Sequence, residues 1–477
     1  MNQQIEGRRR FLRHSALALA VPAIPMRALA QTTLRSRQEW QAFKVTSQYD
    51  SLLRAVTAMK ANTNAADPNS WSYWMNIHLN RCPHGVAYFL AWHRGYMFYF
   101  ERQLRSVSKD PTLMLPYWDY YTYSTLPAEF TDPANPLYVD RVNTNVRQAL
   151  TMAPFSSTLT NFQRGMNNAF EPSLEDAPHN PVHNIIGNVM ATMQSPIDPI
   201  FWMHHGNIDR LWVAWVAAGG GRKMPSATNS YWSGSHIYTS TLSMARKSTR
   251  DTRSTLLYYY QKETMPTSLP LAQLSSSSIM QVQAMPNDIL RNIPPVGSFR
   301  VSAARATGTG TFSMGGALNV GLDERSVSAQ LPLSSAYWTA VQTIAAGTAA
   351  TVPGSATTFR SVELVLDNVQ LAAGGKQGGY YYQVYLNVPA TNAGADRPTS
   401  ILVGTLGAFE INGAAHHGHD SIQLRYTLAR RLLPKSALRV GMVSVSFVRI
   451  DGDKSPKGPA VGIGEARLEL SADDKDA

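Results

Sequence analysis

The sequence predicts a multidomain α + β protein, in which a mainly α-helical domain precedes an antiparallel β-sandwich domain. Up to about residue 265 the chain is rich in Trp, Tyr and Met and has helical hydrophobic spacing, as in 200-IFWMHHGNIDRLWVAW-215. From about residue 299, apolar and polar residues alternate in short runs between Gly, Pro and Asn turns, which is typical of antiparallel strands. A length of 477 residues allows two or three domains.

Residues 1–30 have the features of an export signal. The basic stretch 8-RRRFLR-13 precedes a small apolar run from Ala16 to Ile24, and 28-ALA-30 offers a cleavage site. The Arg-Arg-x-Phe-Leu pattern favours the twin-arginine route over an ordinary signal. The apolar run is far shorter than the ~20 residues that span a bilayer. We therefore expect an exported protein, periplasmic or secreted, without a membrane span.

Composition argues against a nucleic-acid partner. The chain carries 43 basic and 32 acidic residues, and five arginines and one glutamate of these lie in residues 1–30. The modest surplus that remains contains no lysine and arginine block of the kind that nucleic-acid binders show. With Cys82 as the single cysteine, an intramolecular disulfide is excluded. The sequence leaves open whether the chain forms a homo-oligomer.

Seven of the twelve histidines fall into two clusters. The first cluster is His78, His84 and His93, and the second is His179, His183, His204 and His205. Histidine is the commonest metal ligand. Imidazole-only sets, with no carboxylate or thiolate at ligand spacing, favour copper or zinc over magnesium or calcium. Two such clusters in one domain predict two metal ions.

The spacing of the second cluster predicts helices. His179 and His183 are four residues apart, so on a helix both side chains lie on one face. His204 and His205 lie ~100° apart on a helix, so we expect only one of the two to face the site.

In the first cluster, the segment 92-WHRGYMFYFERQL-104 places His93 at the start of a helix. Pro83 argues against continuing that helix back to His84. We therefore expect His84 on a loop that folds back over the helix carrying His93.

These segments resemble a known family. The run 82-CPHGVAYFLAWHRGYMFYFE-101 resembles the first copper motif of tyrosinases, the type-3 dicopper family that includes catechol oxidases and molluscan haemocyanins. The stretches 170-FEPSLEDAPHNPVH-183 and 198-DPIFWMHHGNIDRLW-212 resemble the second motif, and 115-LPYWDY-120 matches a short aromatic signature. The resemblance covers roughly residues 40–260. It implies a dicopper catalytic domain with a four-helix-bundle core, which we assign to residues 31–262.

The resemblance also implies the ligands and the reaction. His78, His84 and His93 would bind one copper (CuA), and His179, His183 and His205 the other (CuB); His205 is chosen because the second member of the family's pair is the ligand. Two Cu(I) ions held ~3.5–4 Å apart can share one O2 molecule. The implied substrates are small phenols, which are hydroxylated ortho to the hydroxyl or, as o-diphenols, oxidised to o-quinones.

Three further residues have implied roles. In tyrosinases, residues matching Glu171 and Asn180 are thought to hold a water that deprotonates the monophenol, which would make them a general-base relay. The alternative is a helix-turn role for Asn180 and a surface ion pair for Glu171. Cys82, two residues before His84, matches an arrangement in which the sulfur forms a thioether with that histidine. The alternative for Cys82 is a buried free thiol.

The main prediction is therefore a tyrosinase-like copper monooxygenase and oxidase. The alternatives are a catechol or o-aminophenol oxidase without monophenolase activity, a haemocyanin-like oxygen-binding protein and, more remotely, a zinc hydrolase. No carboxylate ligand or open-site motif supports the last.

Residues 263–298 read as a linker, with a serine run and two adjacent prolines. Residues 299–477 read as the β-sandwich, with strands over 361–371, 380–388, 401–411 and 440–450. By resemblance this domain is a cap that inserts a large side chain into the copper pocket and keeps the enzyme latent. The candidates are the aromatic strand 380-YYY-382 and Phe409. The alternative is a stabilising domain that never enters the site.

The sequence also predicts structural positions for several other side chains. Arg94, Asp209 and Arg210 lie beside histidines on the central helices, so we expect a buried ion pair involving Asp209. Tyr258 and Tyr260 resemble the tyrosine motif that closes the catalytic domain. We expect His236 at the surface. The loop 416-HHGHD-420, with His416, His417 and His419, reads either as a copper pick-up site or as an exposed polar turn.

Overall fold

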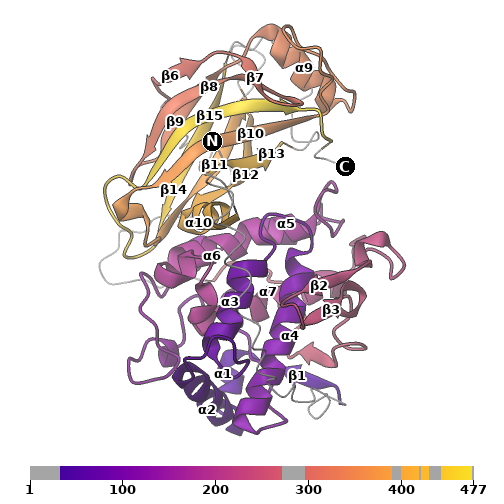
Figure 1. Cartoon of the computed structure of the whole chain (residues 1–477), viewed down its shortest axis with the longest axis vertical. Helices are drawn as coiled ribbons and strands as arrows, with labels where there is room; N and C mark the ends of the chain where they lie inside the picture. Colours follow the sequence, from indigo (N-terminus) through magenta and orange to yellow (C-terminus); the bar gives the residue numbers. More distant parts are fainter. Residues whose placement is uncertain (1–32, 271–295, 389–398, 418–420, 429–441, 475–477) are drawn as a thin grey trace, which may run out of the picture.

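The computed structural model describes residues 33–270, 296–388, 399–417, 421–428 and 442–474. Figure 1 shows a helical part, coloured indigo to magenta, below a β-rich part, coloured orange to yellow, with α5, α6 and α10 at the junction. This is the predicted order of a helical domain followed by an antiparallel sandwich. The predicted signal at residues 1–30 lies outside the described residues. The domain boundaries at residues 30, 262 and 298 remain predictions.

In the described residues, the first part contains seven α-helices and one π-helical turn. They are α1 (Trp40–Phe43), α2 (Ser47–Ala61), α3 (Trp71–Arg81), α4 (Phe89–Ser108), α5 (Phe170–Leu174), the π-helical turn Glu175–His179, α6 (Asn180–Ile186) and α7 (Ile200–Ala217). The Ser70 side chain caps α3 by accepting a hydrogen bond from the Ser72 N–H. Helix α4 contacts both α2 and α7, and α3 contacts α2.

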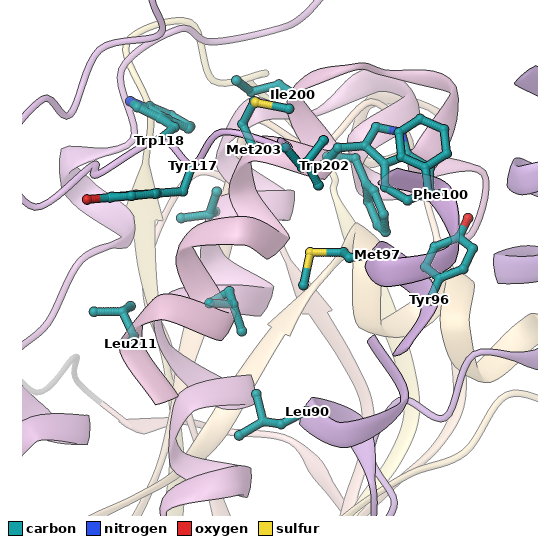
Figure 2. Packing of buried hydrophobic residues seen from close by; sticks show 14 of the residues in the cluster. Leu90, Tyr96, Met97, Phe100, Tyr117, Trp118, Ile200, Trp202, Met203 and Leu211 are labelled. Atoms are coloured by element: carbon teal, nitrogen blue, oxygen red, sulfur yellow. The ribbon is translucent and has the colours of Figure 1, made fainter. Parts of the chain in front are cut away.

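An aromatic core joins α4 and α7 (Figure 2). The rings of Phe100 and Trp202 are stacked with centroids 3.4 Å apart, and Tyr96 packs against the same tryptophan at 4.9 Å. Helix α7 buries fifteen of its eighteen residues, polar ones included. Its histidines therefore face neighbouring helices and not solvent.

A buried ion-pair network ties these helices together, as predicted. Asp209 on α7 accepts hydrogen bonds from Arg94 Nε on α4 at 2.5 Å and from the hydroxyls of Tyr258 and Tyr260, each at 2.6 Å. Both tyrosines lie on β4 (Tyr258–Tyr260), which pairs in parallel with β1 (Arg35–Arg37). Asp209 thus connects two helices to the segment that closes the helical part.

The second part is a sandwich of two sheets with one shared core. The six-stranded sheet contains β6 (Arg300–Ser302), β7 (Arg305–Gly308), β8 (Thr311–Leu322), β10 (Ser361–Leu371), β13 (Leu424–Thr427) and β15 (Val461–Ser471). The five-stranded sheet contains β5 (Val296–Gly297), β9 (Val327–Pro332), β11 (Tyr380–Val388), β12 (Thr399–Gly407) and β14 (Met442–Asp451). Among the described strands of these two sheets, all pairings are antiparallel except that of β5 with β9.

Two strands coincide with their predicted runs, 361–371 and 380–388, and β14 covers nearly all of a third. The expected strand over 401–411 is wrong in its second half. Strand β12 ends at Gly407 and helix α10 (Ala408–His417) follows. Helix α9 (Ser335–Ala345) also lies in this part and was not expected from the sequence.

The two parts meet through backbone contacts. Asn143 Nδ2 donates to the Gly379 carbonyl at 3.3 Å, and its Oδ1 accepts from the Lys454 N–H at 2.6 Å. The Gly379 N–H donates to the Asn184 carbonyl at 2.7 Å. Gly379 has a φ of +87°, and a Cβ there would lie 2.6 Å from the Val142 side chain. We call the β-rich part the cap, because it covers α5 and α6 (Figure 1).

Candidate metal centre

The first histidine set converges from two helices and the loop between them. His78 lies near the end of α3, His84 on the loop that follows it and His93 in the second turn of α4. Their ring centroids are 5.3–5.7 Å apart. The expected loop position of His84 is confirmed, since α3 ends at Arg81 and α4 begins at Phe89.

The second set is equally compact. His179 ends the π-helical turn and His183 lies on α6, with ring centroids 4.6 Å apart. The Nε2 atoms of His179 and His205 are 3.3 Å apart. Possible ligand atoms of His179, His183, His204 and His205 all lie within 4.8 Å of one another.

The His204 ring therefore also reaches this group, 4.9 Å from that of His183. The expectation that only one member of the 204–205 pair faces the site remains a prediction, since nearness to the group does not fix where each ring points. The choice of His205 as the ligand remains a prediction.

The two sets face each other. The rings of His93 and His205 are stacked 4.3 Å apart with a 12° interplanar angle, and those of His84 and His179 are 5.5 Å apart. The shortest ring distances between the sets are thus no larger than those within each set. Two ions held by them would be neighbours.

Hydrogen bonds orient four of these rings through Nδ1. His78 donates to the Met193 carbonyl, His183 to the Met190 carbonyl and His93 to the Phe89 carbonyl, each at 2.8 Å. His179 Nδ1 donates to Asn180 Oδ1 at 2.8 Å. With Nδ1 protonated, Nε2 carries the lone pair that a metal accepts. Met190 and Met193 of the segment 187–195 therefore fix the orientation of two of the rings.

The residues fit a pair of copper ions. Burial is the largest cause of a lowered pKa at His93, His179, His204 and His205, and it lowers the pKa of His183 to about 3. These imidazoles are therefore neutral, which is the form that binds metal. In the described part of the chain, His183 Nε2 is buried without a hydrogen-bond partner, an arrangement that a metal ion would satisfy. An all-imidazole donor set suits copper.

The Cys82 thiol lies against the first set. Its Sγ is 3.4 Å from Nδ1 and 3.5 Å from Nε2 of His84. The same sulfur is 3.3 Å from Nε2 of His93, so it lies against the rings of both histidines. The thiol is buried, and burial raises its pKa well above the usual value, which disfavours a free thiolate.

Glu171 and Asn180 are buried near the histidines but have different partners. Glu171 accepts hydrogen bonds from the backbone N–H groups of Leu90 at 3.4 Å and Arg164 at 3.1 Å, and from the Tyr231 hydroxyl at 3.2 Å. The expected alternative of a surface ion pair is wrong, because Glu171 is fully buried. Burial raises the pKa of Glu171, as suits a proton acceptor. Asn180 orients His179.

Glu175 is a further residue that the sequence reasoning missed. Its Oε1 accepts from the Gly85 N–H at 2.7 Å, directly after His84, and its Oε2 pairs with Arg164 at 2.5 Å. Burial raises the pKa of Glu175 to about 6. The spacing of one helical turn from Glu171 is the signal that could have found it.

Phe409 of the cap lies over the second histidine set. Its ring is stacked on that of His183 with centroids 4.1 Å apart and an interplanar angle of 13°. It also approaches His84 at 5.1 Å and His179 at 5.6 Å. The Tyr381 hydroxyl instead donates to the Gln148 carbonyl, and that of Tyr382 to the Asp323 carbonyl. Of the two expected candidates, only Phe409 contacts the histidines.

Two expectations about other histidines are wrong. His236, expected at the surface, is only 4% exposed, because β2 (Ser235–Ile237) turns this side chain inward against Tyr88 and Thr249. His416 and His417 were expected on a loop but end helix α10. His419 lies outside the described residues. In the part of the chain that the structure describes, no helix is long and apolar enough to cross a membrane.

The common central domain of tyrosinase matches residues 46–136 and 128–218. Tyrosinase HcTyr1 of Hahella sp. (strain CCB-MM4) is 30% identical over 237 residues, covering 35% of this chain and 50% of the relative. Chloroplastic polyphenol oxidase A1 of Vicia faba is 28% identical over 297 residues, covering 49% and 48%. The chain thus spans about half the length of these curated relatives.

Two solved structures resemble the whole chain distantly. Latent apple tyrosinase has a TM-score of 0.49 at 20% identity, covering 93% of this chain and 98% of its own. A tyrosinase from Burkholderia thailandensis has a TM-score of 0.44 at 15% identity, covering 87% and 94%. The central-domain match encloses both histidine sets, so the helical part of this chain carries the common central domain of tyrosinase.

Proposed function

We propose that this protein is a phenol oxidase that binds two copper ions and uses O2 to hydroxylate monophenols at the ortho position and to oxidise o-diphenols to o-quinones. The observation that carries the proposal is the convergence of two buried histidine sets within the central domain of this family. His78, His84 and His93 hold one copper, and His179, His183 and His205 hold the other. Bound copper supplies the electron transfer to and from O2.

The protein's own groups position and orient the imidazole rings. Carbonyls of Phe89, Met190 and Met193 fix three imidazoles so that Nε2 faces the metals. A thioether between Cys82 Sγ and His84 would lock the orientation of this loop-borne ring. The nearness of the sulfur to the His84 ring supports this bond.

Hydroxylation of monophenols requires removal of the phenolic proton. The buried carboxylate of Glu171, with its raised pKa, and the amide of Asn180 beside His179 support a water-mediated relay for this proton. An Asn180→Gly variant should lose monophenolase activity relative to diphenolase activity. An unchanged ratio of the two activities would favour the alternative, a catechol or o-aminophenol oxidase.

The position of the Phe409 ring on His183 supports the proposal that the enzyme is latent. A phenol ring cannot stack on His183 while the Phe409 ring lies there, so α10 must move before substrate binds. A haemocyanin-like carrier with a permanently closed pocket is the second candidate, and the same stacking contact favours it over an open enzyme.

One experiment separates these functions. Copper-loaded full-length protein is given O2 with L-tyrosine, 4-methylcatechol or 2-aminophenol, and quinone or quinone-imine formation and O2 consumption are followed. Turnover of tyrosine and the catechol supports the proposal. Reversible O2 uptake without turnover, also after Phe409→Ala, would identify a carrier, and zinc-loaded protein serves as the redox-inactive control.

Export is the remaining part of the proposal. We assign residues 1–30 to a twin-arginine signal, which carries folded proteins and so suits copper loading before export. Replacing Arg8 and Arg9 with lysine should retain the protein inside the cell, as fractionation would show.

A further inference from the structure

A tyrosine hydroxyl from a distant segment reaches the Glu171 carboxylate. Tyr231 lies in the short 3-10 helix Ser230–Trp232, and its hydroxyl donates to Glu171 Oε1 at 3.2 Å. Both side chains are buried. The Leu90 N–H donates to the same oxygen at 3.4 Å, and the Arg164 N–H donates to Oε2 at 3.1 Å. Two of these three donors are backbone groups, so Tyr231 is the one that a substitution can remove.

The three donors leave one position open on the carboxylate. An ionised carboxylate has about four acceptor positions, shared equally between its two oxygens. Among the described residues, Oε1 of Glu171 receives two donors and Oε2 receives one. A further donor such as a water molecule therefore has room at Oε2. This oxygen is the atom at which Glu171 can take up a proton.

The Tyr231 ring is held in place by aromatic neighbours. Its centroid lies 4.7 Å from that of Tyr88 and 5.9 Å from that of Phe162. Its backbone N–H donates to Asn229 Oδ1 at 2.9 Å. Burial, reinforced by the charge of Glu171, raises the pKa of Tyr231 well above its usual value. The hydroxyl therefore keeps its proton and acts as a donor to the carboxylate.

We infer that Tyr231 is a positioning residue for hydroxylation, which holds the Glu171 carboxylate ionised and leaves Oε2 open to the water that carries the phenolic proton. This inference rests on the proposed function. A hydrogen bond to the ionised form of a carboxyl favours that form. The charge of Arg164 also favours it, whereas burial and the nearby Glu175 oppose it. Without the Tyr231 hydroxyl, the balance moves towards the protonated acid, which cannot accept the proton.

The test follows the ratio of hydroxylation to oxidation as the pH changes. Copper-loaded full-length protein is assayed with 4-methylphenol and with 4-methylcatechol, which serves as the internal reference. The fraction of molecules with α10 displaced multiplies both rates equally, so the ratio does not depend on latency. In Tyr231→Phe the acid limb of this ratio should move to higher pH by roughly one unit, the effect of one hydrogen bond to a charged group.

Tyr121→Phe is the matched control. Tyr121 is also a buried tyrosine whose hydroxyl donates, at 2.8 Å, but its acceptor is the Thr151 carbonyl and not a carboxylate. This variant should leave the profile unmoved. Replacement of Tyr231 by 3-fluorotyrosine keeps the ring and makes the hydroxyl a stronger donor, so the acid limb should move to lower pH. Superimposed profiles of Tyr231→Phe and the parent, or an equal shift in Tyr121→Phe, overturn the inference.

A second measurement needs no turnover. Difference infrared spectroscopy, with Glu171→Gln as the blank, follows the pH at which the Glu171 carboxyl loses its proton in the full-length protein. This midpoint should rise in Tyr231→Phe and not in Tyr121→Phe. A parent that oxidises the catechol but never hydroxylates the phenol overturns the hydroxylation proposed above. If the parent acts on both and the midpoint is unmoved in Tyr231→Phe, only the role of Tyr231 fails.

Discussion

Glu175 accepts a hydrogen bond from the Gly85 N–H at 2.7 Å and thereby joins the segment that leads to His179 to the loop that carries His84. Each histidine set is built on its own stretch of chain, and this carboxylate connects the two stretches. Arg164 pairs with the same carboxylate at 2.5 Å and balances its charge. The position of the His84 loop therefore depends on a residue 90 positions further along the chain.

Glu175→Ala should weaken copper binding by the first histidine set. The variant leaves the Gly85 N–H and the Arg164 guanidinium without their partner, so the His84 loop loses its anchor. Loss of such a supporting contact typically costs 10–100-fold in metal affinity, and copper retained after dialysis should fall from about two ions per chain towards one. Glu263→Ala, which removes an exposed pair with Arg253, is the control and should retain both ions. Full retention by the Glu175 variant would contradict the assignment.

Asp209→Ala should destabilise the helical part severely. Removal of this carboxylate leaves Arg94 as a buried uncompensated charge and deprives two tyrosine hydroxyls of their acceptor. Breaking a buried pair in this way costs about 3–5 kcal/mol. Chemical denaturation followed by tryptophan fluorescence measures it. Asp323→Ala removes a surface pair with Arg325 and should cost less than about 1 kcal/mol; equal losses would contradict the network.

Phe409→Ala should raise the activity of the full-length protein towards small catechols. The variant empties the ring position on His183 without cutting the chain. Tyr381→Phe, which removes only the hydrogen bond to Gln148, should remain as latent as the parent. Initial rates of 4-methylcatechol oxidation compare the three proteins. Rates that are equal in all three would show that Phe409 does not limit access.

Stability should fall as the pH rises through about 7, partly because of Asp176. Burial, with Glu175 and Glu410 adding repulsion, raises the pKa of this carboxyl to about 7, although Arg164 opposes the shift. A carboxyl whose pKa is raised in the folded state stabilises the fold only while it is protonated, so its contribution is lost as the pH rises. Asp176→Asn should remove about 2–4 °C of the fall in Tm between pH 5 and 8, the change that ~1 kcal/mol produces in a domain of this size. Parallel Tm curves would contradict this.

Intact mass should show the thioether. Bond formation removes the Cys82 thiol hydrogen and one ring hydrogen of His84, so copper-loaded, oxygen-exposed protein should be two hydrogens lighter than Cys82→Ser predicts after correction for the substitution. The denatured protein should also have no titratable thiol. Recovery of one thiol per chain would leave Cys82 as the buried free thiol.

The sequence was informative where several residues report on one feature. Both histidine sets, the loop position of His84 after Pro83, the Asp209 ion pair and strands β10 and β11 follow from spacing and motif. The hydrophobic periods of helices and strands are local properties of the chain, so they can be recognised without knowledge of tertiary contacts.

Expectations failed where tertiary contacts decide the secondary structure or the burial of a residue. The alternation of Phe409, Glu410 and Ile411 reads as a strand, but docking of this segment on α6 makes it a helix. His236 reads as polar and exposed, yet Ile237 beside it is the exposed residue. The spacing from Glu171 could have singled out Glu175, but its partner Gly85 lies 90 residues away in the chain, so the contact itself could not be predicted from local spacing.

The seam between the helical part and the cap is made largely by peptide groups and asparagine amides, at Asn143, Asn184 and Gly379. Neutral dipoles of this kind offer little for dissolved ions to screen. The helical part and the cap should therefore stay joined at low and at high salt concentration alike. Access to the histidine sets then depends on movement of the short helix α10 and not of the whole cap.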